Sequence, residues 1–419
     1  MEQETKSIGI PLLGSVPNSG TASKAQTLGN IIVTIVGTGV LGLPFAFRVA
    51  GCLAGALGVI IAGISNYYCM LLLIRCREKL AEEPSGESRT YGDLGYICMG
   101  TPGRYLTEFL ISISQCAGAV AYLVFIGQNL LSVFNGCGLS LTSYVFLIVP
   151  IEIGLSWIGS LAAFAPFSIF ADVCNALAMG IVLKEDIQQV LGAKFLFAER
   201  TVIASNIGGL PFAAGMAVFC FEGFGMTLAL QNSMKDKTTF PRLLAQAVAG
   251  ITLVYVSFGF FGYMAYGDQT RDIVTLNLPR NWSSLAVQVG LCLALVFTFP
   301  IMLHPINEIV EERLKRGKKL HNSNIDDSTI AGKVGKYISR AVLVILLAVL
   351  TSFVPQFGVL ASLAGSTVCA LISFVLPATF HLRIFGASLH LWQKLLDCVI
   401  VSCGLLFAAY GTYNAVFGV

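Results

Sequence analysis

Long apolar stretches, separated by short polar segments, run through most of this chain of 419 residues. Each stretch holds about 20 residues with few charges, which is the length that an α-helix needs to cross the hydrocarbon core of a bilayer. Several connections are only a few residues long, so consecutive helices should run antiparallel. We expect an all-α integral membrane protein with eleven transmembrane helices, at residues 27–50, 53–74, 105–134, 140–158, 161–183, 206–231, 242–266, 284–310, 338–355, 358–381 and 392–417.

The composition supports a membrane protein, because 55% of the residues are hydrophobic and only 12% are charged, whereas soluble domains have about 25% charged residues. Residues 1–26 are mostly polar and lack the apolar core and cleavage site of a secretory signal. We expect them to form a disordered cytosolic tail, followed by a first span that acts as its own insertion signal. The twelve cysteines form no CxxC pair and the four histidines have no metal-ligand spacing, so the sequence predicts no cofactor and no metal centre.

Lysine and arginine set the orientation. If the N-terminus is cytosolic, 20 of them fall on the cytosolic side and 6 on the other side, as the positive-inside rule requires. An odd number of spans then places the C-terminus on the non-cytosolic side. The basic loop 311–337 is read as a solvated loop that sets the topology, or alternatively as a surface for anionic lipid. A sequon at Asn281 falls in a non-cytosolic loop, and the sequence leaves its glycosylation open.

Two of the predicted spans contain helix breakers near their middle. Residues 37–44 hold three glycines and a proline, and residues 221–225 hold two glycines and a glutamate. Irregular backbone at this depth is tolerated only where it is buried in protein or lines a cavity. The alternative is a glycine-packed helix interface, because glycine is common in membrane helices.

The hydropathy pattern also predicts an inverted repeat. Spans 1–5 (27–183) and spans 6–10 (206–381) can be superposed as two units that enter the membrane from opposite sides, with 392–417 as an extra span. The two breaks then occupy the first span of each unit, which is typical of a transporter binding site. A broken helix exposes N–H groups that suit a carboxylate and carbonyl groups that suit an ammonium group, so the breaks favour a zwitterionic amino acid.

The same residues carry a family resemblance. The run from Gly29 to Pro44 resembles the first span of the amino acid/auxin permease family, and the run from Phe219 to Met234 resembles its sixth. Residues 161–176 and 362–382 also resemble the family, so that the similarity extends from about 25 to 415. The chain is most similar to the proton-coupled and vacuolar amino acid transporter branches.

This resemblance implies a 5+5 inverted repeat of the LeuT/APC type, with broken helices 1 and 6 and a free amino acid as the substrate. It also implies that the first break supplies backbone contacts and that the second break completes the site. The substrate-binding residues would be Val36, Gly37, Thr38, Gly39 and Val40, together with Phe221, Glu222, Gly223 and Phe224. Some proton-coupled members have a histidine in the first span, and this chain has none there.

Three ionisable side chains at membrane depth are candidates for proton coupling, because such groups are costly in a bilayer and are often functional. Glu222 lies in the second break, where a carboxyl group removed from water can bind and release a proton; alternatively it caps the half-helix. Asp172 could carry the proton or pair with a neighbouring helix. His304 could relay it or serve only in packing.

Three hydroxyl groups remain as further candidates. Tyr122, in the third span, could lie over the substrate or hydrogen-bond to another helix. Thr34 and Thr298 could contribute to a sodium site, although most threonines in membrane helices hydrogen-bond within their own helix.

The sequence therefore predicts a secondary active transporter of amino acids, which works by alternating access and symport with protons, and whose other partner is membrane lipid. The lack of basic residues at the breaks suggests neutral substrates. No ATP-binding motif and no nucleic-acid-binding feature is present, and the histidines form no cluster that an enzyme would need. A sodium-coupled transporter and an amino acid sensor remain alternatives. The family branch favours a vacuolar or lysosomal-type membrane, with the plasma membrane as the alternative.

Overall fold

The structure is a computed structural model. It describes residues 20–81, 90–134, 136–158, 161–192, 200–203, 208–320, 330–354, 356–386 and 388–417; within these ranges, the side chains of residues 161–163, 165, 312–320, 330–333 and 415–417 are not described. Most of the predicted N-terminal tail and part of the basic loop 311–337 therefore lie outside the described residues.

The first span is broken at its glycine-rich run. Helix α1 (Lys24–Ile35) ends at Val36, and Gly37 has extended backbone angles. A short turn, η1 (Thr38–Gly42), then leads into α2 (Leu43–Ala50), with a proline in the first turn of the helix, where its missing N–H is tolerated. The two parts of the span are bent by 46° relative to each other.

Helix α1 begins three residues before the predicted start of the span. Ser23 and Gln26 form a capping box, in which each side chain accepts a hydrogen bond from the backbone N–H of the other residue. Residues 24–26 therefore belong to α1, and the local capping signal sets the start of the helix.

The sixth and tenth spans are also irregular. The sixth consists of α7 (Gly209–Cys220) and α8 (Phe224–Ser233), separated by three residues without helical structure. The tenth contains two consecutive π turns and is made of four segments, which are α12 (Phe357–Ala364), η6 (Gly365–Cys369), η7 (Leu371–Val375) and α13 (Leu376–Phe385).

The other helices are longer. They are α3 (Cys52–Ala81), α4 (Tyr91–Val133), α5 (Leu141–Ser156), α6 (Leu161–Leu191), α9 (Phe240–Tyr266), α10 (Trp282–Leu320), α11 (Ile330–Ser352) and α14 (Leu391–Phe417). Three short turns, η3 (Lys237–Thr239), η4 (Gly267–Gln269) and η5 (Val274–Asn277), lie in the connections. Helix α4 is kinked at Gly100, whose φ of 68° favours glycine.

Nine helices of the described chain are long and apolar enough to cross a membrane, and the bent first span makes ten. Helix α5 is apolar but has only 16 residues. The predicted total of eleven requires α5 to cross as well, so this total stays a prediction.

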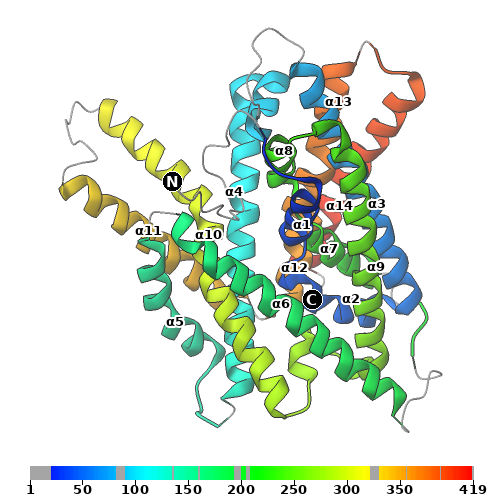
Figure 1. Cartoon of the computed structure of the whole chain (residues 1–419), viewed down its shortest axis with the longest axis vertical. Coiled ribbons are helices and arrows are strands. Elements are labelled where there is room, and N and C mark those ends of the chain that lie inside the picture. Colours follow the sequence, from blue (N-terminus) through cyan, green and yellow to red (C-terminus); the bar gives the residue numbers. More distant parts are fainter. Residues whose placement is uncertain are drawn as a thin grey trace, which may run out of the picture.

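Figure 1 shows the broken spans in the interior of the bundle. Helix α3 packs against α9, and both pack against the half-helix α2; α3 also packs against α7, and α9 packs against α1. Helix α10 packs against α6 and α4, while α5 and α11 lie together at one edge. The broken spans are therefore enclosed by unbroken helices, which can satisfy or shield their irregular backbone.

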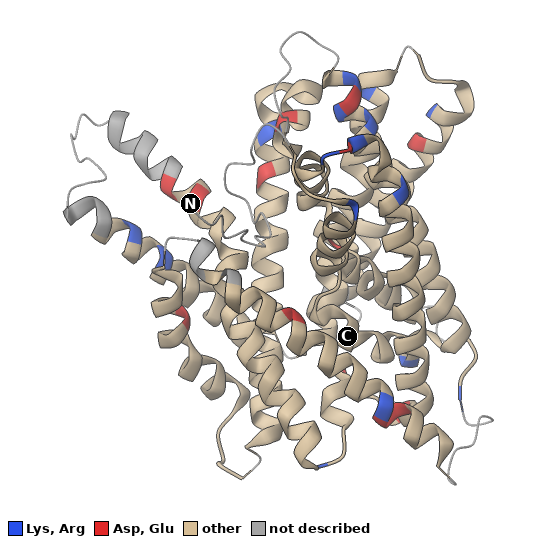
Figure 2. Ribbon diagram, in the orientation of Figure 1, with Lys and Arg blue, Asp and Glu red and all other residues tan. Residues whose placement is uncertain are grey.

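Lysine and arginine residues gather at one end of the bundle, at the top of Figure 2. This end, called the N-side below, holds the start of α1 and the ends of α3, α8 and α13; the opposite end is called the far side. A few basic residues also lie on the far side, and others lie on α11 at one edge of the bundle.

On the N-side, the two broken spans are tied to each other and to α3. The N–H of Ala22 donates to the carbonyl of Ser233 at 3.0 Å, and the N–H of Lys235 donates to the carbonyl of Ala22 at 3.2 Å. Arg77 of α3 donates through Nη1 to the carbonyl of Leu228 in α8 at 2.7 Å. The N-side ends of α1, α3 and α8 therefore form one packed unit.

Candidate functional site

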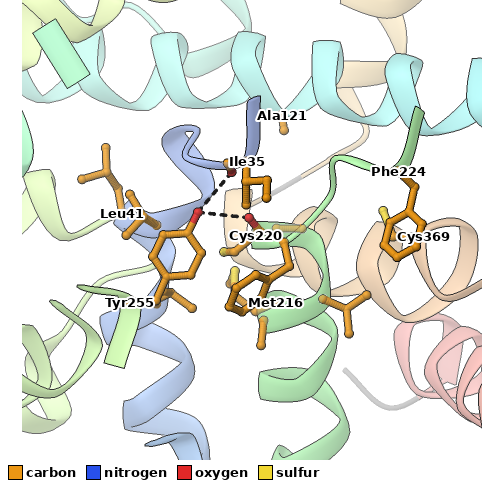
Figure 3. Packing of buried hydrophobic residues seen from close by; sticks show 14 of the residues in the cluster. Ile35, Leu41, Ala121, Met216, Cys220, Phe224, Tyr255 and Cys369 are labelled. Carbon is orange, nitrogen blue, oxygen red and sulfur yellow. Dashed lines mark hydrogen bonds between the residues drawn. The ribbon is translucent and has the colours of Figure 1, made fainter. Parts of the chain in front are cut away.

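The breaks in spans 1 and 6 lie side by side and are joined by one hydroxyl group. Tyr255 of α9 is fully buried, and its Oη lies 3.1 Å from the carbonyl oxygens of both Ile35 and Cys220 (Figure 3). These residues end α1 and α7, so their carbonyl groups lack a partner within their own helix. The tyrosine shares its donor between two helix ends and holds the two breaks together.

Only part of each break is accessible. Val36 and Gly37 are partly exposed, as are Glu222 and Gly223, whereas all residues of η1 are buried. A Cβ atom placed on Gly37 would meet no atom of the described chain within 4 Å. Open space therefore lies beside the backbone at the first break.

The breaks offer both kinds of backbone hydrogen-bonding group. The turn η1 and helix α8 start after Gly37 and Gly223, and neither start has a side-chain cap. The N–H groups at such starts carry partial positive charge and suit a carboxylate. The ends of α1 and α7 present carbonyl groups that suit an ammonium group. This arrangement can bind a zwitterion through the main chain.

Glu222 places a carboxyl group in the second break. Its Oε2 is buried and has no hydrogen-bond partner among the described residues. The groups that act on the carboxylate are the thiol of Cys369, the hydroxyl of Ser373 and the N–H of Phe224. The hydroxyl of Ser373 is buried and acts on the carboxylate without forming a hydrogen bond of standard geometry within the described chain. A buried charge is costly unless it is paired. The stability of the ionised form of Glu222 therefore depends on how well these neighbouring groups compensate its charge.

Glu222 faces a boundary between two groups of helices, with spans 1 and 6 and α3 on one side and span 10 and α4 on the other. Cys369 belongs to the tenth span, and Figure 3 shows it beside Phe224. Its Sγ lies 3.8 Å from the Oγ of Ser114 in α4, so span 10 packs on α4 at this level. Glu222, in contrast, belongs to the broken span that Tyr255 ties to span 1. A change in the charge of Glu222 therefore changes the interactions between the two sides of the boundary.

Phe221 and Phe224 are placed behind the accessible backbone. Their exposed fractions are 1% and 0%. The ring of Phe221 packs against Tyr255 with ring centroids 5.1 Å apart. In this structure the two phenylalanines support the breaks by packing, and their side chains do not face open space.

Tyr122 and Asp172 lie together, on α4 and α6. The carboxylate of Asp172 acts electrostatically on the hydroxyl of Tyr122. Gly118, one turn before Tyr122, packs against Met302 of α10, so this face of α4 is turned toward α6 and α10. This position favours an interaction of Tyr122 with a neighbouring helix over a place above the substrate, and Asp172 is its neighbour there.

The remaining candidates have local partners. Nδ1 of His304 lies 3.6 Å from Oε1 of Glu308, one turn further along α10. The hydroxyl groups of Thr34 and Thr298 donate to carbonyl groups of their own helices at 2.7 and 3.0 Å. Both threonines therefore hydrogen-bond within their own helix, which is the alternative to a sodium site.

A cavity of about 1170 Å³ lies on the far side. Phe45 and Arg48 of α2, Gln128 of α4 and Asp272 line part of it, and none of the predicted substrate-binding residues does. Asp272 accepts hydrogen bonds from Nε2 of Gln128 at 3.0 Å and from the N–H of Phe357 at 2.9 Å. The described lining of the cavity thus lies apart from the breaks, and Asp272 ties its loop to spans 3 and 10.

Sequence reasoning missed Tyr255, although a signal was present. A tyrosine in the middle of a membrane span carries a hydroxyl group that must find a partner within the protein. The sequence gives no indication of which carbonyl groups that partner would be.

These features can be compared with known proteins. The family model described as "Transmembrane amino acid transporter protein" matches residues 20–417. The chain is 61% identical to amino acid transporter ANT1 of Arabidopsis thaliana, over 98% of this chain and 97% of that protein. It is 26% identical to the proton-coupled amino acid transporter-like protein pathetic of Drosophila melanogaster, over 93% of this chain and 84% of that protein. It is 27% identical to vacuolar amino acid transporter 4 of Saccharomyces cerevisiae, over 96% of this chain and 59% of that protein.

Two solved structures share the fold. The inward-facing structure of Mhp1 has a TM-score of 0.61 at 13% identity, over 95% of this chain and 89% of that chain. MhsT in complex with L-phenylalanine has a TM-score of 0.57 at 15% identity, over 95% of this chain and 100% of that chain. These neighbours have the LeuT fold, so the predicted all-helical fold of the LeuT type is confirmed, while the 5+5 repeat stays a prediction.

The predicted family is confirmed as well. The sequence relatives are named as transporters, so the chain is not an enzyme. Because the family model spans nearly the whole chain, the protein belongs to the transmembrane amino acid transporter family.

Proposed function

We propose that the chain is a proton-coupled secondary transporter of neutral amino acids in the membrane of a vacuole-like or lysosome-like organelle. One observation carries this proposal. Glu222 is a carboxyl group with an unpartnered buried oxygen, in an accessible break and on the boundary between two groups of helices. Such a group links the binding of a proton to the closing of the boundary.

The substrate would bind beside Gly37 and Gly223. Its carboxylate would accept hydrogen bonds from the N–H groups at the helix starts, and its ammonium group would donate to carbonyl groups that Tyr255 leaves free. Residues 27–47 and 208–234 contain no lysine or arginine, and Glu222 is their only acidic residue. No side chain of these two segments could neutralise an acidic substrate, which supports a preference for neutral amino acids.

Proton coupling would follow from the charge of Glu222. A proton from the more acidic side converts the carboxylate to the neutral acid, and the boundary can then close without burying a bare charge. On the other side the proton leaves to water, the carboxylate forms again, and the boundary opens and releases the substrate. Proton and amino acid thereby move in the same direction, and the two sides open alternately.

The gathering of basic residues at the N-side supports a cytosolic N-side. If α5 also crosses, the eleven spans form the 5+5 repeat with one extra helix, and the C-terminus lies on the far side. The names of the yeast and fly relatives support an acidic organelle and proton coupling. In that setting the amino acid would leave the lumen together with a proton.

Replacing Glu222 with glutamine tests the proposal, because glutamine keeps the size of the side chain but cannot bind and release a proton. In proteoliposomes with an imposed pH gradient, accumulation of a radiolabelled neutral amino acid should fall at least about tenfold, the ratio that one pH unit can sustain. Exchange with amino acid loaded inside the vesicles should persist, because exchange needs no net movement of protons.

Asp172→Asn is the matched control, since Asp172 is the other acidic candidate at membrane depth. It should retain accumulation driven by the pH gradient. Unchanged accumulation in Glu222→Gln would contradict the role of Glu222. For the wild-type protein, accumulation that follows a sodium gradient would favour a sodium-coupled transporter, and binding without accumulation would favour a sensor.

A further inference from the structure

A second pair of titratable side chains is buried on the N-side, away from the breaks. Nδ1 of His381 in α13 lies 2.6 Å from Oδ2 of Asp397 in α14, and the two side chains are 4% and 0% exposed. Oδ1 of Asp397 is buried and has no hydrogen-bond partner among the described residues. The buried carboxylate is compensated while the ring carries a proton, and it loses this compensation when the ring becomes neutral. Burial of the pair therefore favours the form in which the imidazole ring carries a proton.

The pair holds the imidazole ring in a fixed orientation. Because Asp397 occupies Nδ1, Nε2 of His381 is the ring atom left to bind or release a proton, as in other carboxylate–histidine pairs. The ring of Phe385 packs against the imidazole with ring centroids 4.9 Å apart. Nζ of Lys79 lies 4.2 Å from the ring centroid of Phe385 and donates to the carbonyl of Ile384 at 3.0 Å. Lys79 is therefore held by a ring and a carbonyl group instead of by Asp397.

Other titratable or charged groups surround the pair on the neighbouring elements. They are Tyr68, Cys69, Cys76 and Lys79 of α3, Tyr91 and Cys98 of α4, Arg383 of α13 and Lys394 of α14. The segment η7, which also packs on α13 and α14, carries no titratable side chain. Thiols, phenols, lysine and arginine ordinarily keep their charge state between about pH 5 and 8. Among side chains, an imidazole is the one whose ordinary charge change falls within that range.

The pair joins α13 to α14 and lies beside α3, because Asp397 acts electrostatically on Cys69 and Cys76. Helix α13 packs on α3, and this contact continues toward the N-side the boundary that Glu222 faces. Helix α3 is tied to α8 through Arg77, so it belongs to the unit that carries the breaks. Tyr91 lies between the two sites. Its hydroxyl is acted on by Glu222 and by Cys69, and it donates to the carbonyl of Ile372 at 2.6 Å. One boundary thus has a titratable group at mid-membrane and another at its N-side end.

We propose that His381 and Asp397 form a second proton-binding site, through which the pH on the N-side controls the opening of this boundary. The inference rests on the proposed function, because it requires a proton to leave on the N-side. One proton passes between Nε2 and water on the N-side, and no bond between heavy atoms changes. With the proton bound, the boundary stays closed. After the proton leaves, Asp397 keeps an uncompensated charge and a bare oxygen, which favours the entry of water and opening.

The experiment measures amino acid exchange in proteoliposomes of known orientation, with the far-side pH fixed and the N-side pH varied. In the wild-type protein, exchange should rise with N-side pH between about pH 5 and 8, by up to roughly tenfold per pH unit in the steepest part. His381→Gln should make this profile clearly shallower and leave the dependence on far-side pH unchanged. Glu222→Gln, in contrast, should lose the accumulation driven by a gradient.

The outcomes separate the two proposals. A wild-type N-side profile in His381→Gln overturns the second proton site and leaves the proposed function intact. Absence of both exchange and gradient-driven accumulation in the wild-type protein overturns the proposed function, and the second site falls with it.

Because His381→Gln could fail to fold, a measurement on the unaltered protein is needed as well. The chain has four histidines, and the ring signals of the other three can be assigned in ¹⁵N NMR spectra with H304Q, H321Q and H390Q. The remaining signal, from His381, should change between the protonated and neutral forms between about pH 5 and 8. A ring that keeps one protonation state throughout this range would overturn the proposal.

Discussion

Replacing Tyr255 with phenylalanine is expected to destabilise the protein by about 1–3 kcal/mol and to lower uptake about tenfold or more. The hydroxyl group is the donor shared by the carbonyl groups of Ile35 and Cys220. Without it, two buried acceptors at the ends of α1 and α7 lose their hydrogen bond, and an unsatisfied buried acceptor costs about 1–3 kcal/mol. The breaks would lose their mutual position, and each 1.4 kcal/mol of lost transition-state stabilisation lowers a rate about tenfold.

The substitution is specific, because phenylalanine keeps the ring that packs against Phe221 at 5.1 Å. The effect can be measured as a fall in melting temperature in detergent and as a slower initial rate of uptake at saturating substrate. Tyr67→Phe is the matched control. Tyr67 of α3 donates to the carbonyl of Pro241 in α9 at 3.4 Å, a longer bond away from the breaks. If Tyr255→Phe were as stable and as active as Tyr67→Phe, the shared hydrogen bond would not hold the breaks together.

The spans and their breaks could be predicted from the sequence because their signals are local. A helix that crosses a bilayer must be long and apolar, and glycine or proline at its centre interrupts the helical hydrogen bonds. Residues 36–37 and 221–223 are non-helical for this reason. The capping box at Ser23 is an equally local signal, and it sets the start of α1.

The partners of the site could not be predicted, because they depend on packing between distant segments. Phe221 and Phe224 belong to the predicted site, but their side chains are buried behind it. Cys369 reaches Glu222 from the π turns of span 10, where no proline or run of glycines marks the irregular backbone. Which residues of a helix face a neighbour depends on the crossing of the two helices, and that information is absent from either helix alone.

Gly365→Ala is expected to give the other large effect, through the contact between spans 6 and 10. Gly365 has φ −64° and ψ −46°, ordinary helical angles that any residue can adopt. A Cβ atom at this position would overlap with the carbonyl oxygen of Gly215 in α7 and would lie 2.9 Å from the backbone nitrogen of Phe219. The obstacle to alanine is thus the close approach of two backbones, which cannot be relieved by rotating a side chain.

Alanine at position 365 should therefore separate span 10 from α7, and overpacking of this kind costs about 1–3 kcal/mol. The displacement would be passed along η6 to Cys369, which faces Glu222, so that the boundary could no longer close around the neutral acid. We expect uptake to fall about tenfold or more, in line with about 1.4 kcal/mol per factor of ten, with a lower melting temperature. The initial rate of uptake and the thermal melt in detergent measure the two effects.

Gly58→Ala separates this steric effect from the general effect of adding a methyl group. Gly58 lies within α3, and a Cβ atom there would meet no atom of the described chain within 4 Å. Alanine also favours the helix by up to about 1 kcal/mol over glycine, so this variant should keep wild-type uptake and stability. If Gly365→Ala matched Gly58→Ala in both measurements, spans 6 and 10 would have room for a side chain between them. The close approach of Gly215 and Gly365 would then be no part of the mechanism by which the boundary closes over Glu222.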